Sequence, residues 1–297
     1  MQGNIKEHAK VMTFLDSGAF SADTSGTPIV LANYIEYVKE NEHLLDIYPV
    51  LDVLGDVKAT WENQRLMEEA GLAPCPVFHA DEDFSYLHRC LEYDYFCLGG
   101  LAGGVSGAVR QAFLNKCFEI ICDTPDRMPK CKVHGFGLAS PSLMTAYPFY
   151  SVDTSSWVAY SQYGTILIPR IDRGNIFRYD MPPVKIFVTE RSPKKNEEGM
   201  HMQNLSKAER KKAEDYIHSL GFVLGSSTVF AVSADYELQD NEVFINKQKS
   251  AVERADVSGI SNNNTLRYAY NLAYYNAIAE SCPEWPWAWS PKIKSFF

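Results

Sequence analysis

Four apolar segments in the first half of the chain end on residues that could do chemistry. FLD ends on Asp16, VLDV carries Asp52, YSVD ends on Asp153, and FCLGGLAGG has the pair Gly99 and Gly100 at its end. A single aspartate after a strand is typical of a turn or a helix cap. Three of them at one edge of a sheet could instead divide the roles of nucleophile, general acid/base and hydrogen-bond acceptor.

The glycine pair predicts close approach of a ligand to the backbone. LGGLAGG has neither the GxGxxG spacing nor the GK[ST] ending, so it does not favour a dinucleotide site or a P-loop. Glycines at a strand end leave backbone N–H and C=O groups open to a flat ligand. Phe20 and His134 are available as stacking walls. The sequence therefore predicts a pocket for a planar heterocycle.

Strand-like and helix-like patterns alternate through the first half of the chain. The segments VMTFLD, IYPVLDV, CPVFHA, YFCLGGL, KVHGFGLA and FYSVDT are typical of buried strands. Between them, helix starts are predicted at Thr60, Asp83, Ser106 and Ser140, the last followed by a proline. Repeated units of this kind indicate a parallel sheet, either doubly wound or closed as a (β/α)₈ barrel.

The second half supplies candidates for the remaining strands. TILIP, VKIFVT and FVLGSSTVFAV would be enough to close an eight-stranded barrel. Ser206 and Glu209 form a capping-box pattern for a helix that ends before Gly221. A last helix, LRYAYNLAYYNAIAE, places four apolar residues on one stripe. We therefore predict a single α/β domain over residues 1–297, a (β/α)₈ TIM-like barrel with insertions.

In this order and at about these separations, LDSGAF, PVLDV, LGGLAGG, HGFG and YSVDTSSWV resemble the guanine transglycosylase family. These enzymes exchange guanine in tRNA for a 7-deazaguanine, and a branch found in phages and bacteria inserts 7-deazaguanines into DNA. The resemblance runs from about Phe14 to Trp157. It returns more faintly in YNLAYYNAIAE, which is similar to the family's closing helix. It implies a barrel fold, no cofactor, and a free base such as preQ0 or preQ1 as second substrate.

The resemblance also implies roles for individual residues. Asp153 matches the nucleophile that attacks C1′ and forms a covalent glycosyl–enzyme intermediate, and Asp16 matches the general acid/base for the exchanged base. Asp52 matches the residue that hydrogen-bonds the purine. Backbone contacts to the base fall on Gly100 and Leu101, beside Gly99. The stacking walls fall on Phe20 and His134.

The chain also departs from the family pattern. His79 stands where the family has a base-reading glutamine, and Ala19 and Ser21 replace a glycine and a glutamine of the first motif. The zinc-binding CxCxxC of the tRNA enzymes is absent, so the predicted fold lacks the C-terminal zinc subdomain and no metal is predicted. Cys117, Cys122, Cys131 and His134 are grouped in sequence, but we expect buried thiols there rather than a metal site.

Composition and charge restrict the partners. The net charge of −9 argues against a nucleic-acid-binding protein whose whole surface is basic. Residues 170–212 are the exception, with 11 Lys/Arg against 6 Asp/Glu. There Arg170, Arg173, Lys194 and Lys195 would contact phosphates, although charge alone favours an ordinary solvated surface. Seven scattered cysteines, no signal peptide and no membrane-length apolar run predict a cytoplasmic protein, in the host cytoplasm if phage-encoded.

Three functions stay open at this stage. The first is base exchange on a polynucleotide, with DNA favoured over tRNA because the zinc motif is missing. The second is a metal-independent glycosidase that shares the carboxylates but lets water replace the incoming base. The third is a non-catalytic barrel that binds a partner through its basic segment and the aromatic tail WPWAWSPKIKSFF. The sequence does not decide whether the protein forms a homodimer, as members of the family do.

Overall fold

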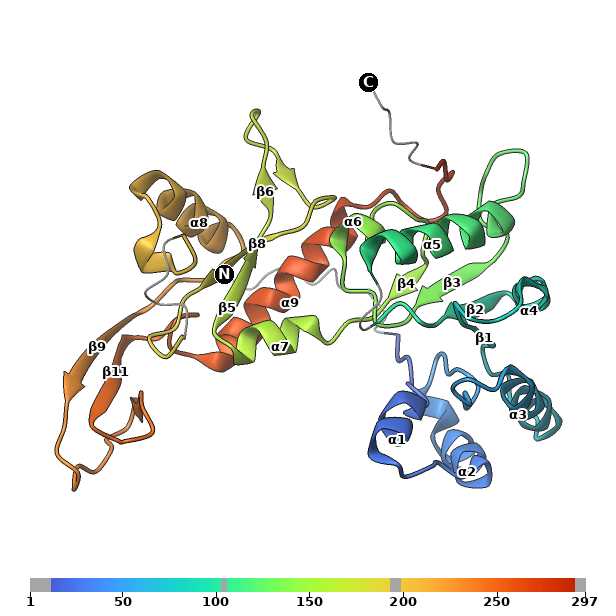
Figure 1. The fold of residues 1–297 in the computed structure, drawn as a ribbon, viewed down its shortest axis with the longest axis horizontal. Helices are drawn as coiled ribbons and strands as arrows, with labels where there is room; N and C mark the ends of the chain where they lie inside the picture. The colour runs from blue at the N-terminus through green and yellow to red at the C-terminus, as the bar shows by residue number, and fades with distance from the viewer. Residues whose placement is uncertain (1–11, 103–105, 193–198, 292–297) are drawn as a thin grey trace. The chain divides into compact units, whose positions relative to one another are not determined.

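The computed structural model describes residues 12–102, 106–192 and 199–291, and Figure 1 shows their fold. The described chain forms two compact units. Of the described residues, those within Met1–Leu138, Tyr147–Asp153 and Trp285–Phe297 belong to the first unit, and those within Ala139–Ala146 and Thr154–Glu284 belong to the second. Within the described ranges, no helix has the length and hydropathy of a bilayer span.

A parallel sheet forms the centre of the first unit. Its four strands lie in chain order, and every neighbouring pair is parallel. Parallel bridges from Pro49 to Cys75 and from Phe14 to Ile47 add two more extended segments, again in chain order. The strands are β1 (Val77–Phe78), β2 (Tyr95–Leu98), β3 (Lys132–Gly135) and β4 (Ser151–Val152).

The sheet of the first unit is strongly curved. The rings of Phe14 and His134 stack with their centroids 4.3 Å apart. These residues lie four strand positions apart, and in a flat sheet that number of positions spans about 19 Å. The contact therefore requires the sheet to curl, which brings its first and fifth segments together on one side.

Helices follow most of the parallel segments, and the predicted start signals account for several of them. Asp83 caps the backbone N–H of Ser85, and Ser106 caps that of Val109, as predicted. The predicted start at Thr60 was wrong. Asp56 caps the N–H of Ala59, and the helix begins at Val57. The helices are α1 (Ala19–Ser25), α2 (Leu31–Asn41), η1 (Glu42–Leu44), α3 (Val57–Glu69), α4 (Phe84–Cys90) and α5 (Gly107–Ile121).

The second unit is built on antiparallel pairs. The segments TILIP and VKIFVT, predicted to continue the parallel sheet, pair with each other in antiparallel register as β5 and β8. FVLGSSTVFAV supplies an edge strand of an antiparallel sheet in the order β10-β11-β9. The strands are β5 (Thr165–Ile168), β6 (Arg170–Ile171), β7 (Phe177–Arg178), β8 (Val184–Phe187), β9 (Ser226–Ala231), β10 (Glu242–Phe244) and β11 (Ala251–Val257).

The long helix α9 (Asn264–Ser281) organises the second unit. Tyr270, Tyr274 and Ile278, three residues of the predicted apolar stripe, are buried on this helix. The amide of buried Asn271 donates to the Thr165 carbonyl and accepts from the Leu167 N–H, and thereby fixes the helix to β5. The predicted capping box at Ser206 is confirmed. The helices are α6 (Pro141–Met144), α7 (Ser156–Gln162), η2 (Met202–Asn204), α8 (Lys207–Ser219) and α9 (Asn264–Ser281).

Candidate functional site

The first unit gathers the predicted chemical residues at the carboxyl edge of its parallel sheet. His79 directly follows β1, Gly99 directly follows β2, and Asp153 directly follows β4. Asp16 and Asp52 follow the two bridged segments that extend the sheet. Carboxyl ends of parallel strands share one edge, and ligands of parallel α/β folds bind at that edge.

Asp52 and His79 form a closely bonded pair at this edge. The distance from His79 Nε2 to Asp52 Oδ2 is 2.6 Å, and the two side chains are only 16% and 8% exposed. The other oxygen of Asp52 accepts a 2.9 Å hydrogen bond from the Thr60 hydroxyl. Thr60 in turn accepts from the Val53 N–H. Both carboxylate oxygens are thus held from the protein side, which fixes the orientation of the pair.

The charges around His79 favour its protonated form. Burial alone would lower the pKa of His79, but the hydrogen bond and charge of Asp52 outweigh burial, and the pKa is raised. Glu82 and Asp81 add to this effect. Burial also raises the pKa of Glu82 itself, to about 6. The edge therefore carries an imidazole whose charged form is favoured and a carboxyl group, that of Glu82, that titrates close to neutral pH, as general acids and bases do.

The His79 ring occupies the space above Gly99, where we expected a flat ligand. A Cβ atom at position 99 would lie 2.3 Å from Cε1 of His79. Gly100 is also constrained, with φ of +73°, a value that favours glycine. The glycine pair thus makes room for the imidazole at its first position and for a left-handed turn at its second.

Gly99→Ala should displace His79 from Asp52. Because the ring cannot stay within 2.3 Å of a methyl group, we expect the hydrogen bond to Asp52 to break and the variant to lose about 1–3 kcal/mol of unfolding free energy. Urea unfolding measures the loss. Gly107→Ala is the control, since nothing lies within 4 Å of a Cβ there. Equal stability of the two variants would contradict the prediction.

His134 and Asp153 form a second bonded pair. Asp153 Oδ1 accepts from the Gly137 N–H at 2.8 Å and lies 3.3 Å from Nε2 of His134. On the other side of the ring, Nδ1 lies 2.6 Å from the Ser151 hydroxyl, which also bonds the Tyr95 hydroxyl. A neutral imidazole satisfies the whole chain if Tyr95 donates to Ser151, Ser151 to Nδ1, and Nε2–H to Asp153.

Asp153 has the properties of an available carboxylate. Partial burial would raise its pKa, but the bonds from His134 and Gly137 outweigh burial and lower it. The side chain is 55% exposed, whereas His134 is 4% exposed. Asp153 is therefore ionised, oriented by a buried partner, and accessible to a ligand, as a carboxylate nucleophile must be.

Phe14 connects the strand that leads to Asp16 with this second pair. Its ring stacks on His134, and Asp16 follows two residues later. The buried thiol of Cys97 is influenced by both carboxylates. Burial raises the pKa of Cys97, and the negative charges of Asp153 and Asp16 raise it further. Asp16 itself accepts a hydrogen bond from the Gly18 N–H in the turn that follows.

A pocket opens beside Asp52. Its volume is about 450 Å³, within the range of small-molecule sites. Asp52 contributes to the wall, together with α1 residues such as Ala19 and Ala22 and the Asn63 side chain of α3. The other predicted site residues do not line it. The pocket therefore lies beside Asp52 of the first bonded pair, whereas His79 is not among its lining residues.

The other predicted site residues have different surroundings. Phe20 on α1 is 72% exposed, and the side chain of Leu101, whose backbone was predicted to contact the base, is buried in the core. Arg170 and Arg173 belong to the second unit. Lys194 and Lys195 lie outside the described residues. Phe20 can stack only on a ligand that covers its exposed face.

Sequence reasoning missed the residues that support the two pairs. Thr60 was interpreted as a helix start, and Glu82, Ser151 and Tyr95 were not considered. Ser151 is two residues before Asp153, so both side chains project to the same side of the strand. This spacing was the one available signal, because the other partners come from distant parts of the chain.

The cysteines are free thiols, and most of them are buried. Burial raises the pKa of Cys117 well above its usual range and that of Cys122 to about 12. In the part of the chain that the structure describes, no three His, Cys, Asp or Glu side chains are grouped as ligands for a metal ion.

Comparison of the chain with protein-family models, curated proteins and solved structures finds no match.

Proposed function

We propose that the protein is a base-exchange pentosyltransferase that replaces guanine in a polynucleotide, preferentially DNA, with a 7-deazaguanine. The observation that carries the proposal is the ionised, accessible Asp153, oriented by buried His134 beside the strand that leads to Asp16. The order of motifs along the chain, which resembles the guanine transglycosylase family, supplies the reaction class.

The proposed reaction proceeds in two displacements. An Asp153 oxygen attacks C1′ of the target nucleoside, and the bond from C1′ to N9 of guanine breaks with its electron pair on the base. Asp16 donates a proton to the departing base. Asp16 then takes the N9 proton of the incoming 7-deazaguanine, whose nitrogen attacks C1′ and releases the Asp153 carboxylate.

The Asp52–His79 pair is proposed to recognise the base. In the family that the chain resembles, an aspartate and a glutamine stand at these two positions. Here each Asp52 oxygen already accepts one bond, and each keeps a further lone pair for a donor on the purine. The imidazole can offer or accept a proton where a glutamine amide cannot, so the selected base need not be the one that the family selects.

The barrel fold is proposed together with the function. Six parallel segments in chain order, curled so that the first touches the fifth, are what the first part of a (β/α)₈ barrel requires. The antiparallel β5–β8 pair departs from a regular barrel.

Access to C1′ restricts the form of the DNA. A base inside a duplex cannot reach a pocket at a sheet edge, so the target must be single-stranded or extruded from its stack. Because the chain carries a net charge of −9, we expect weak binding that depends strongly on salt.

Incubation with labelled guanine and either single-stranded DNA or tRNA tests the proposal. Exchange predicts label in DNA, loss of that label on addition of preQ0 or preQ1, and an Asp153-linked sugar adduct by mass spectrometry. Label in tRNA alone would support the tRNA alternative. Release of guanine at a rate independent of added base would support hydrolysis, and no reaction with either polymer would contradict the proposal.

A further inference from the structure

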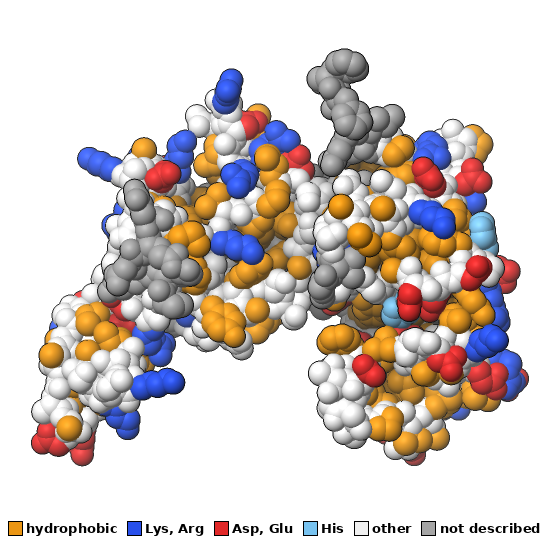
Figure 2. Space-filling view, viewed as in Figure 1, with side chains coloured by type: hydrophobic (Ala, Val, Ile, Leu, Met, Phe, Trp, Pro, Cys, Tyr) orange, Lys and Arg blue, Asp and Glu red, His pale blue; other side chains and the backbone are white. Residues whose placement is uncertain are grey.

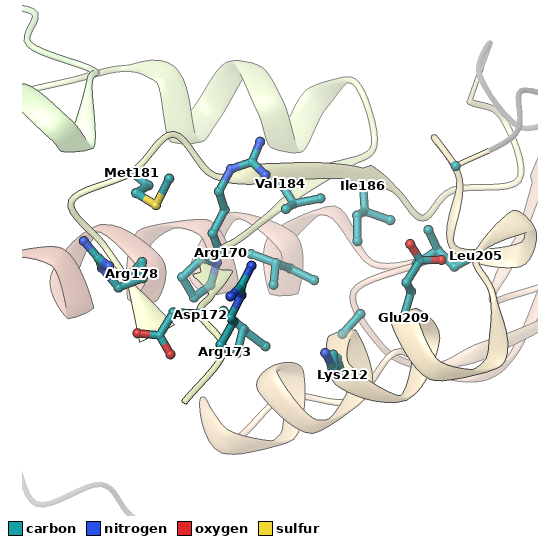
Figure 3. A pocket seen from close by; sticks show the side chains of 15 residues that line it. Arg170, Asp172, Arg173, Arg178, Met181, Val184, Ile186, Leu205, Glu209 and Lys212 are labelled. Atoms are coloured by element: carbon teal, nitrogen blue, oxygen red, sulfur yellow. The ribbon is translucent and has the colours of Figure 1, made fainter. Parts of the chain in front are cut away.

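The second unit contains a pocket that none of the chemistry above uses. Its volume is about 550 Å³, and β6, β8, α8 and the turn after β6 line it. In Figure 3 the Arg178 and Asp172 side chains lie at one end and those of Leu205 and Glu209 at the other. The Arg170 and Arg173 side chains lie between them. Every lining residue belongs to the second unit.

Partners within the protein already hold several of the charged groups. Asp172 accepts from the N–H groups of Gly174 and Ile176. Glu209 accepts from Ser206 in the capping box. Arg178 forms a bidentate pair with Asp180. The two acids of the pocket are thus engaged, as is one of its three arginines.

Two arginines retain donors for a ligand. Arg170 donates its Nε–H to the Pro182 carbonyl at 3.2 Å, which leaves its terminal nitrogens for other acceptors. Arg173 is exposed on the turn after β6 and makes no hydrogen bond or ion pair with the residues that the structure describes. Lys212 adds a third cationic group to the same lining. Guanidinium groups of this kind bind phosphate oxygens, often in pairs.

The rest of the lining is aliphatic. Met181 and Val184 lie on the wall and are 38% and 37% exposed, and Ile168 and Ile186 continue it. Figure 2 shows Lys and Arg side chains over the part of the second unit that carries β6, β8 and α8, with hydrophobic side chains between them. An inorganic anion would use only the cationic side of such a pocket. The lining suits an anion that carries an apolar, flat body.

We propose that this pocket binds a nucleoside phosphate, with the phosphate on Arg170 and Arg173 and the base against Met181 and Val184. The nucleotide is either free or one unit of a DNA strand. Its identity as a nucleotide rests on the proposed function, because the pocket chemistry specifies only an anion with an apolar body. None of its lining residues belongs to the carboxylate pairs, whose residues all lie in the first unit.

Fluorescence anisotropy with a labelled single-stranded dT12 oligonucleotide, measured on the full chain at several NaCl concentrations, tests this site. Arg173→Glu should weaken binding at least about tenfold and reduce the slope of log affinity against log salt by about one. Val184→Trp should fill the apolar part and weaken binding without a change in that slope. Lys247→Glu is the matched control, an equal charge change at an exposed residue of the same unit outside the pocket.

Competition by unlabelled dTMP distinguishes the two sources of the ligand. If dTMP displaces the oligonucleotide, the pocket accepts free nucleotides; if it does not, the pocket holds a unit of a strand. Arg173→Glu and Val184→Trp affinities that both equal the Lys247→Glu affinity would overturn the proposal. Circular dichroism confirms that the variants are folded.

The exchange assay separates this proposal from the proposed function. If Arg173→Glu keeps both base exchange and oligonucleotide binding, only the proposal of the nucleotide site is contradicted. If binding depends on Arg173 but the protein has no exchange activity, only the proposed function is contradicted.

Discussion

Asp153→Asn should abolish the covalent glycosyl–enzyme adduct and lower the rate of base exchange by at least about 10³-fold. The amide keeps the size of the side chain and can still accept from the Gly137 N–H, so the edge of the sheet should keep its shape. It lacks the negative charge that the lowered pKa of Asp153 maintains. Mass spectrometry for the adduct and a labelled-guanine assay for the rate measure the two effects.

Asp94→Asn is the matched control for this substitution. Asp94 is exposed and directly precedes β2, so it lies at the opposite edge of the same parallel sheet. The same change there should leave both adduct and rate within about twofold of the wild-type protein. An adduct that persists in Asp153→Asn would show that another group is the nucleophile and would contradict the role proposed for Asp153.

Local sequence signals predicted those parts of the fold that short-range hydrogen bonds decide. Asp83, Ser106 and Ser206 each cap the backbone N–H of a residue two or three positions later. The prediction of a helix start at Thr60 failed because Asp56, four residues earlier, is also a suitable N-cap residue and caps this helix. Asp56 satisfies the Ala59 N–H, and this releases the Thr60 hydroxyl to support Asp52.

Strand direction in the second half could not be predicted in this way. The segments TILIP and VKIFVT have the continuous apolar pattern of parallel, doubly covered strands. In the structure they pair antiparallel. All four residues of β5 are buried, and Leu167 of this strand bonds Asn271 of α9, whereas β8 leaves Val184 and Lys185 exposed. The apolar pattern therefore predicted neither the direction of the pairing nor the exposure of β8.

The candidate site was predictable in position but not in detail. The rule for carboxyl ends of parallel strands places Asp52 and Asp153 at one edge. The partner of Asp52 lies 27 residues away, and that of Asp153 lies 19 residues away. Such pairs depend on the curvature of the sheet and on the rotamers of both residues. Phe20 is exposed on α1, and its stacking on a base stays a prediction.

Asp52→Asn should destabilise the protein in a manner that depends on pH. In the wild-type protein, a buried carboxylate stabilises protonated His79 through a 2.6 Å bond. The amide removes the charge, and we expect a loss of about 2–3 kcal/mol of unfolding free energy at pH 5.5. Urea unfolding of both proteins at pH 5.5 and pH 9 measures the difference.

The direction of the pH effect follows from the raised pKa of His79. A group whose pKa is higher in the folded protein contributes its stability fully below its unfolded value, about 6.5. That contribution is lost as the pH rises through the folded value. The destabilisation by Asp52→Asn should therefore be larger at pH 5.5 than at pH 9. The negative charge of Asp52 also raises the pKa of Glu82, which is about 6 and is raised mainly by burial. Removal of that charge favours ionised Glu82 at pH 9, which likewise makes the destabilisation smaller at pH 9 than at pH 5.5.

Asp56→Asn provides the control, because it changes a neighbouring carboxylate that caps α3 and does not contact His79. It should cost no more than about 1 kcal/mol, and equally at both pH values. A destabilisation by Asp52→Asn that is the same at pH 5.5 and pH 9 would mean that His79 is neutral in the folded protein. The imidazole would then act at this edge as a neutral hydrogen-bonding group, and proton transfer to the base would depend on Asp16 alone.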